Sequence, residues 1–177
     1  MIEDSPREKD KTEISAAHIR RITLSAVLTA TAVILSPLYF SAGTTKCFPA
    51  QHMINGIAGV LLGPWYAALI ALATGMIRNA LGLGTIYAFP GGIPGALVVG
   101  FLRNYLKNDY AALTEPLGTV VIGATISALL FAPWQGHPFS LSFFWIAFAA
   151  SSIPGSILGF TVLKALRRTG VIKHIVR

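Results

Sequence analysis

Arg78 and Asn79 are the side chains whose chemistry is least expected from their surroundings, because they lie inside the apolar stretch Trp65–Leu83. A charged side chain at membrane depth costs roughly 2.5–3.5 kcal/mol on insertion scales, and it marks a functional site by default. Guanidinium and amide groups donate hydrogen bonds, so this pair could bind an acceptor on a ligand. No Asp or Glu occurs between Glu13 and Asp109 to neutralise the arginine. The group that Arg78 contacts is therefore the main question about its role.

The composition around this pair is that of a multi-pass membrane protein. The 177 residues are 54% hydrophobic and 12% charged, whereas a soluble domain averages roughly 25% charged. The net charge of +7 does not indicate nucleic acid, because the basic residues flank apolar segments instead of gathering on a soluble domain. Cys47 is the only cysteine, which excludes an intrachain disulfide and a thiolate metal cluster. We expect a protein of the cell (plasma) membrane.

Apolar stretches separated by Pro and Gly predict the elements that position these residues. A membrane-spanning helix needs roughly 17–25 residues, and the second stretch is short enough to be tilted or partly re-entrant. The expected fold class is an all-α integral membrane protein, a six-transmembrane-helix bundle. Its spans are Ile22–Phe40, Ala50–Gly63, Trp65–Gly82, Pro90–Leu106, Pro116–Phe131 and Leu141–Leu166. This gives a charged N-terminal tail at 1–21, a membrane domain at 22–166 and a basic C-terminal tail at 167–177.

The charges predict the orientation of this bundle. With six spans, all basic residues except Lys46 and Arg78 fall on one side, so the positive-inside rule makes both termini cytoplasmic. All seven acidic residues fall in cytoplasmic segments too, with Glu115 in the loop before the fifth span. We therefore expect no carboxylate inside the bundle. Such a site suits a neutral or weakly anionic aromatic molecule better than a cation.

The same orientation gathers polar and aromatic side chains in the outer half of the bundle. Arg78 lies 14 residues beyond Pro64, which is roughly 21 Å along a helix. It either bonds backbone carbonyls and supports the outer loops, or it contacts the ligand directly. The aromatic residues could equally be interfacial anchors, and His137 a simple loop residue. The candidate ligand-binding residues are Asn55, Arg78, Asn79, Phe89, Trp134, Gln135, His137 and Trp145.

No pattern in the sequence indicates an enzyme or a metal site. There is no His, Cys, Asp or Glu cluster with metal-ligand spacing, no nucleophile–base motif and no phosphate-binding loop. Small residues four apart allow helices to approach closely in lipid. We expect Gly59/Gly63, Gly91/Gly95 and Gly155/Gly159 to pack inside the bundle, and Ala26/Ala30 on the first helix to be a docking surface for another membrane subunit.

Three runs of the central region carry a family likeness. They are INGIAGVLLGPW at Ile54–Trp65, TGMIRN at Thr74–Asn79 and FPGGIPGA at Phe89–Ala96. Together they resemble the ThiW-type substrate-binding (S) components of energy-coupling factor (ECF) transporters, and the resemblance extends from the first span to the sixth.

The resemblance implies uptake of a thiamin precursor, with hydroxyethylthiazole the usual assignment. It implies a transmembrane coupling (T) subunit and two cytoplasmic ATPases as partners, so that ATP is used by the partners and this chain binds no cofactor. In the family an Ala-xxx-Ala pair on the first helix meets the T subunit, and here that pattern falls on Ala26 and Ala30. Ligand contacts come from outer loops and the last three helices. The alternatives left open are an S component for a different vitamin, an intramembrane enzyme, and a solitary facilitator or channel.

Overall fold

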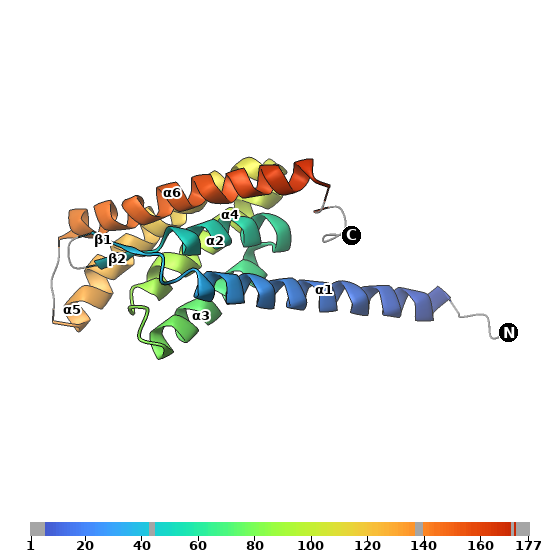
Figure 1. Cartoon of the computed structure of the whole chain (residues 1–177), viewed down its shortest axis with the longest axis horizontal. Helices are drawn as coiled ribbons and strands as arrows, with labels where there is room; N and C mark the ends of the chain where they lie inside the picture. Colours follow the sequence, from blue (N-terminus) through green and yellow to red (C-terminus); the bar gives the residue numbers. More distant parts are fainter. Residues whose placement is uncertain (1–5, 43–44, 137–139, 171, 173–177) are drawn as a thin grey trace.

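The helices of the chain form a bundle that carries one short β-hairpin at its end (Figure 1). The computed structural model describes residues 6–42, 45–136, 140–170 and 172. The α-helices are α1 Pro6–Ile34, α2 Pro49–Leu62, α3 Pro64–Ala80, α4 Ala88–Leu106, α5 Ala132–Trp134 and α6 Leu141–Arg168, and the strands are β1 Phe40–Ala42 and β2 Thr45–Cys47. Between α4 and α5 lie the 3-10 helix η1 Asp109–Thr114 and the π-helical segments η2 Leu117–Ala124 and η3 Ser127–Phe131.

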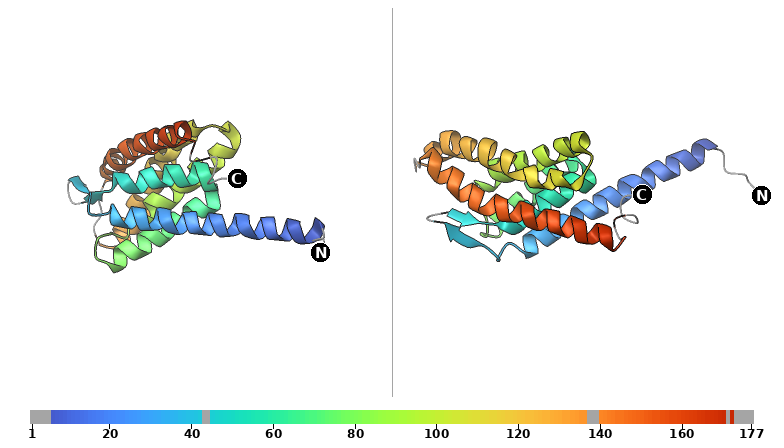
Figure 2. Two further views of the ribbon diagram at one scale, coloured as in Figure 1. Left: turned by 45° about the vertical axis from the view of Figure 1, so that its right-hand side comes forward. Right: turned by 90° about the horizontal axis from the view of Figure 1, so that it is seen from above.

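Successive passes of the chain run in alternating directions (Figures 1 and 2). One end of the bundle, the hairpin end, carries β1 and β2, the turn before α4, the end of α5 and the start of α6. The opposite end, the terminal end, carries the turn at Gly63, the turn after α4, the start of α1 and the end of α6. The first part of α1 projects beyond the bundle at the terminal end (Figure 1).

Three helical segments in the described part of the chain are long and apolar enough to cross a membrane: Ile14–Ile34, Asp109–Trp134 and Leu141–Arg168. Helices α2, α3 and α4 are shorter, with 14, 17 and 19 residues. Helix α2 packs against α1, α3, α4 and α6, so it lies in the centre of the bundle. The predicted second, third, fourth and sixth spans agree with α2, α3, α4 and α6 to within two residues at each boundary.

Two sequence-based boundaries are wrong. The first span was expected to reach Phe40, but α1 ends at Ile34 and the chain turns into the hairpin. Pro37 explains this end, because it has no N–H to continue the helix and disfavours a helical conformation at the residue before it. The fifth pass was expected to begin at Pro116, but helical structure begins at Asp109. The second difference changes the site, because it moves Glu115 from a loop into the bundle.

Glycines set the closest approaches between helices. A Cβ on Gly155 would lie 2.4 Å from the carbonyl oxygen of Pro49, and one on Gly118 would lie 2.3 Å from that of Pro94. Both distances are too short for any side chain, so α6 meets α2, and η2 meets α4, backbone to backbone. Internal packing is confirmed for Gly91/Gly95 and Gly155/Gly159, which face neighbouring groups. The pair Gly59/Gly63 is only half right, because Gly63 has φ +85° and forms the turn before α3.

Candidate ligand-binding site

A cavity opens at the hairpin end of the bundle. Its wall is built from β2, the first turn of α2, the last turn of α3, the turn before α4, the first turns of α4 and the first half of α6. The side chains on it combine aromatic rings with hydrogen-bonding groups, which is the usual make-up of a small-molecule site. They include Lys46, Phe48, Gln51, His52, Arg78, Thr85, Tyr87, Phe148 and Ser151.

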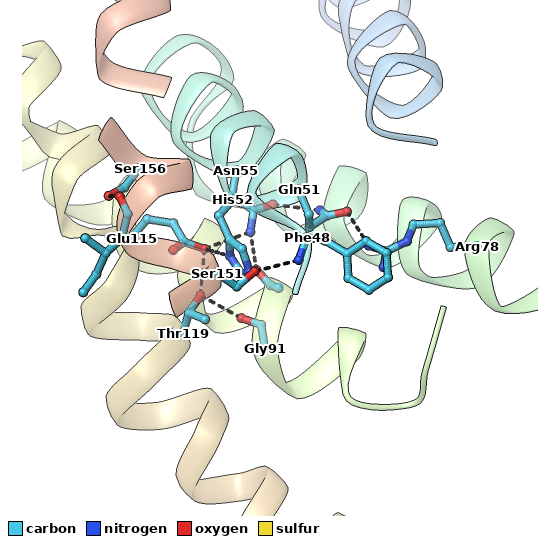
Figure 3. Close-up of polar contacts among 12 residues, drawn as sticks. Phe48, Gln51, His52, Asn55, Arg78, Gly91, Glu115, Thr119, Ser151 and Ser156 are labelled. Carbon is cyan, nitrogen blue, oxygen red and sulfur yellow. Dashed lines mark hydrogen bonds and ion pairs between the residues drawn. The ribbon is translucent and has the colours of Figure 1, made fainter. Parts of the chain in front are cut away.

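Arg78 lies on the wall of this cavity and is only 2% exposed. Its guanidinium carbon lies 3.6 Å from the centre of the Phe48 ring, a cation–π contact. Its Nη1 donates to Gln51 Oε1 at 3.4 Å (Figure 3). Its Nε and Nη2 are buried and have no hydrogen-bond partner among the described residues. The arginine therefore faces an aromatic ring and an amide, and the three N–H groups on its Nε and Nη2 remain unused.

Two amides connect Arg78 to the centre of the bundle. Gln51 Nε2 donates to Asn55 Oδ1 at 3.1 Å, one turn further along α2. Asn55 Nδ2 donates to Glu115 Oε1 at 3.1 Å and to the Gly92 carbonyl at 3.0 Å. An arginine can only donate, so the oxygen of Gln51 must face it, and this fixes the direction of every following bond. Figure 3 shows the continuous row of side chains that results, and we call it the amide relay.

The relay ends on a carboxylate that the sequence placed elsewhere. Glu115 is 0% exposed, and its Oε1 accepts from Asn55 and lies 2.7 Å from Thr119 Oγ1 and 2.7 Å from His52 Nδ1. The expectation that no acid lies inside the bundle is therefore wrong. The physical reason is that Glu115 precedes Pro116, which is a good first residue of a helix, whereas the structure already continues the helical pass from Asp109. Glu115 Oε2 has no partner in the described part of the chain.

His52 stands between the cavity and this carboxylate. The imidazole lines the cavity and its Nδ1 is hydrogen-bonded to Glu115, which fixes the orientation of the ring. Gly95 leaves room for the Glu115 carboxylate, because a Cβ at that position would lie 2.3 Å from Glu115 Oε1. An acid–base pair of this kind can bind polar ligand groups or accept a proton.

The hairpin is fastened to α6 beside the same cavity. The Phe48 N–H donates to Ser151 Oγ at 2.8 Å, and Cys47 Sγ donates to the Ala147 carbonyl at 3.4 Å. Cys47 is 1% exposed, and burial raises the pKa of its thiol, so the thiol stays neutral at physiological pH. These bonds hold the Phe48 ring in place against Arg78.

The candidate ligand residues from the sequence fall into three groups. Arg78 lines the cavity, and Asn55 lies directly behind the wall in the amide relay. Asn79 Nδ2 instead donates to the carbonyls of Gly75 and Thr85 and so closes the turn after α3.

The remaining candidates lie away from the cavity wall or outside the described residues. The Phe89 ring packs over Gly75, where a Cβ would lie 3.0 Å from it. Trp134 is 75% exposed and Gln135 is exposed. Trp145 is 43% exposed, and its Nε1 donates to Thr125 Oγ1 at 3.1 Å. His137 lies outside the described residues. A ligand role for these five residues stays a prediction.

Sequence reasoning missed most of this site, because Arg78 was the only candidate among the side chains on the cavity wall. The candidate list left out Lys46, Phe48, Gln51, His52, Thr85, Tyr87, Phe148 and Ser151, and also Glu115 behind the wall. One signal could have found part of it. Gln51, His52 and Asn55 form a polar stripe on one face of an otherwise apolar helix, at a spacing that brings side chains together.

A comparison with protein-family models matches residues 22–169 to ThiW, described as a thiamine-precursor transporter protein. The match covers most of the chain and includes every residue of the cavity wall. No curated protein matches the chain closely enough to count as a relative.

Proposed function

The chain belongs to the ThiW family of thiamine-precursor transporters, and we propose that it is the substrate-binding (S) component of an ECF importer. It binds a thiamin precursor at the hairpin end and hands it to a T subunit and two ATPases. Its own part is binding, without ATP hydrolysis. The observation that carries the proposal is the cavity, where buried Arg78 presents free donors beside aromatic rings.

The orientation follows from charge. Basic residues occupy the last turns of α4 and α6, at the terminal end of the bundle: Arg103, Arg167 and Arg168. The positive-inside rule favours the cytoplasm for such an end. We therefore place both termini in the cytoplasm, count six passes, and direct the cavity outward.

The proposed ligand is hydroxyethylthiazole or a close derivative of it. The rings of Phe48, Tyr87 and Phe148 on the wall suit a flat heteroaromatic ring. Arg78, Gln51 and His52 supply the hydrogen bonds for its polar atoms. The test is isothermal calorimetry of the purified chain with thiazole and pyrimidine precursors and with other vitamins. Saturable binding of a thiazole precursor supports the proposal, and binding of a different vitamin alone overturns the substrate.

The proposed docking surface for the T subunit is the outer face of α1. Ala26 and Ala30 are exposed, whereas Leu28 and Ala32 on the same helix are buried against the bundle. Small exposed side chains allow a partner helix to approach closely.

One observation favours a second function, that of an intramembrane enzyme. The His52–Glu115 pair is an oriented acid–base pair, and Ser151 lies on the same cavity wall. No hydrogen bond joins Ser151 to His52 among the described contacts, and the hydroxyl instead accepts from the Phe48 N–H. Family membership favours transport. Chemical conversion of a bound precursor by the purified chain would support the enzyme, and recovery of the unchanged molecule supports the binding protein.

A further inference from the structure

The unpartnered nitrogens of the Arg78 guanidinium indicate which chemical group of a ligand could bind there. Of its three nitrogens, Nη1 bonds Gln51, and Nε and Nη2 have no partner in the described residues. The Nε–H and one N–H of Nη2 point in parallel along one edge, and this edge binds two oxygens of a carboxylate or phosphate at once. The Phe48 ring covers one face of the guanidinium, and the two unpartnered nitrogens lie buried at the cavity wall.

The same edge is already used elsewhere in the molecule. Arg167 directs its Nε and Nη2 at the two oxygens of Asp109, and this bidentate pair closes the terminal end. The chain therefore contains an example of the partner that such an edge takes. Arg78 has no equivalent partner among the described residues, because Glu115 lies two amides away at the other end of the relay.

The charge on the cavity wall has one sign. Lys46 and Arg78 both lie on it, and no Asp or Glu is among its described lining residues. A buried charge without a partner is costly, so an anion that pairs with it gains more than it would at the surface. A wall with two cations and no acid therefore selects for negative charge on the ligand.

We propose that the cavity takes a thiazole precursor that carries an oxyanion, either a phosphate monoester or a carboxylate, and that the Nε–Nη2 edge of Arg78 binds two of its oxygens. Lys46 contributes a second positive charge on the wall. This inference rests on the proposed function for the ring and goes beyond it for the charge.

The experiment compares three probes on the purified full-length chain in lipid nanodiscs: hydroxyethylthiazole, its phosphate monoester, and the acid in which a carboxymethyl group replaces the hydroxyethyl group. We expect at least one of the two anions to bind about tenfold or more tighter than the alcohol, because hydrogen bonds between charged groups are the strong ones. Arg78→Gln should remove that preference, and Arg78→Lys should keep only part of it because it lacks the parallel donors. Arg103→Gln is the matched control, because it removes one positive charge at the terminal end and should leave the preference intact.

Equal or tighter binding of the alcohol to the wild type overturns the inference, and so does an anion preference that survives in folded Arg78→Gln. If Arg78→Gln does not fold, competition on the wild type decides. Inorganic phosphate should weaken binding of the phosphate ester, and sodium chloride of equal ionic strength should not. If no thiazole probe binds, the proposed function fails separately. In that case inorganic phosphate alone tests the oxyanion site. The site is supported if phosphate raises the thermal unfolding midpoint of the wild type but not that of Arg78→Lys. It is refuted if phosphate leaves the midpoint of the wild type unchanged.

Discussion

Two pairs of oppositely charged side chains occupy different parts of the bundle, and they are built differently. At the terminal end, Asp109 is 4% exposed and receives both donors of one edge of Arg167, with Nη2 at 2.6 Å from Oδ1. Between the cavity at the hairpin end and the centre of the bundle, Arg78 and Glu115 are both buried, but Gln51 and Asn55 stand between them. We call Asp109 and Arg167, which are in direct contact, the closed pair, and Arg78 and Glu115, which are joined only through two amides, the separated pair.

The difference shows how a bundle can use the same charges for two purposes. The closed pair satisfies both groups and fastens η1 to α6, so nothing of it remains for a ligand. The separated pair is linked through two amides, and Nε and Nη2 of Arg78 stay without a partner among the described residues at the cavity wall. We infer that the terminal end is built for stability and the hairpin end for recognition.

The largest expected effect comes from removing the anion of the separated pair. Glu115→Leu leaves the donors of His52, Asn55 and Thr119 without their acceptor in the core, which should cost about 3 kcal/mol of unfolding free energy. Ligand binding should be lost with the relay. Thermal unfolding and calorimetry in nanodiscs measure both. Glu115→Gln keeps an acceptor oxygen and should recover most of the stability; equal loss in the two variants would mean that the relay is not what Glu115 supports.

The closed pair should respond in the opposite way. Asp109→Asn removes the charge that Arg167 binds, and it should lower the unfolding free energy by about 1–2 kcal/mol, since Arg167 is partly exposed and water compensates it. The dissociation constant of the ligand should stay within a factor of about three, because the cavity is at the other end. A large loss of affinity in a folded Asp109→Asn protein would break the division between the two ends.

Placing a carboxylate directly beside Arg78 should form an ion pair there and weaken the binding of an anionic ligand. Gln51→Glu puts a carboxylate beside Arg78, so the positive charge that awaits a ligand is neutralised. We expect about tenfold weaker binding of an anionic precursor, roughly 1.4 kcal/mol, in a protein that still folds. Gln51→Met is the neutral control, and it should weaken binding less. Unchanged affinity for the anion in Gln51→Glu would argue that Arg78 does not contact the ligand.

The smallest effect on both ends is expected from α1. Ala26→Leu with Ala30→Leu enlarges exposed side chains far from either charged pair, so stability and ligand affinity should not change. Co-purification with the T subunit should be lost, because the larger side chains hold the partner helix away. Val27→Leu, also on the exposed surface of α1, is the matched control. Intact assembly of the double variant would refute the docking role.

Much of the helical framework could be predicted from the sequence, because Pro and Gly mark the turns and four of the spans agree closely with the helices observed. The hairpin could not, since a three-residue strand has no periodicity that separates it from the apolar residues before it. Within the site, Arg78 and Asn55 were predicted from polarity in an apolar setting. Phe48 and Phe148 were not, because an aromatic residue in a membrane protein has no pattern that distinguishes a wall from a lipid-facing anchor.

By itself the sequence determined that the chain belongs in a membrane, where four of its helices begin and end to within two residues, and that an unusual arginine lies on α3. Hydropathy and turn residues act locally, so these properties can be deduced from neighbours in the chain. Only the tertiary structure decided what Arg78 faces and where Glu115 goes. The relay joins α3, α2 and the segment after η1, which are far apart in sequence, and such a network exists only once packing has brought the three together. Glu115, which the sequence places in a loop, lies within the bundle and is connected to Arg78 through two amides.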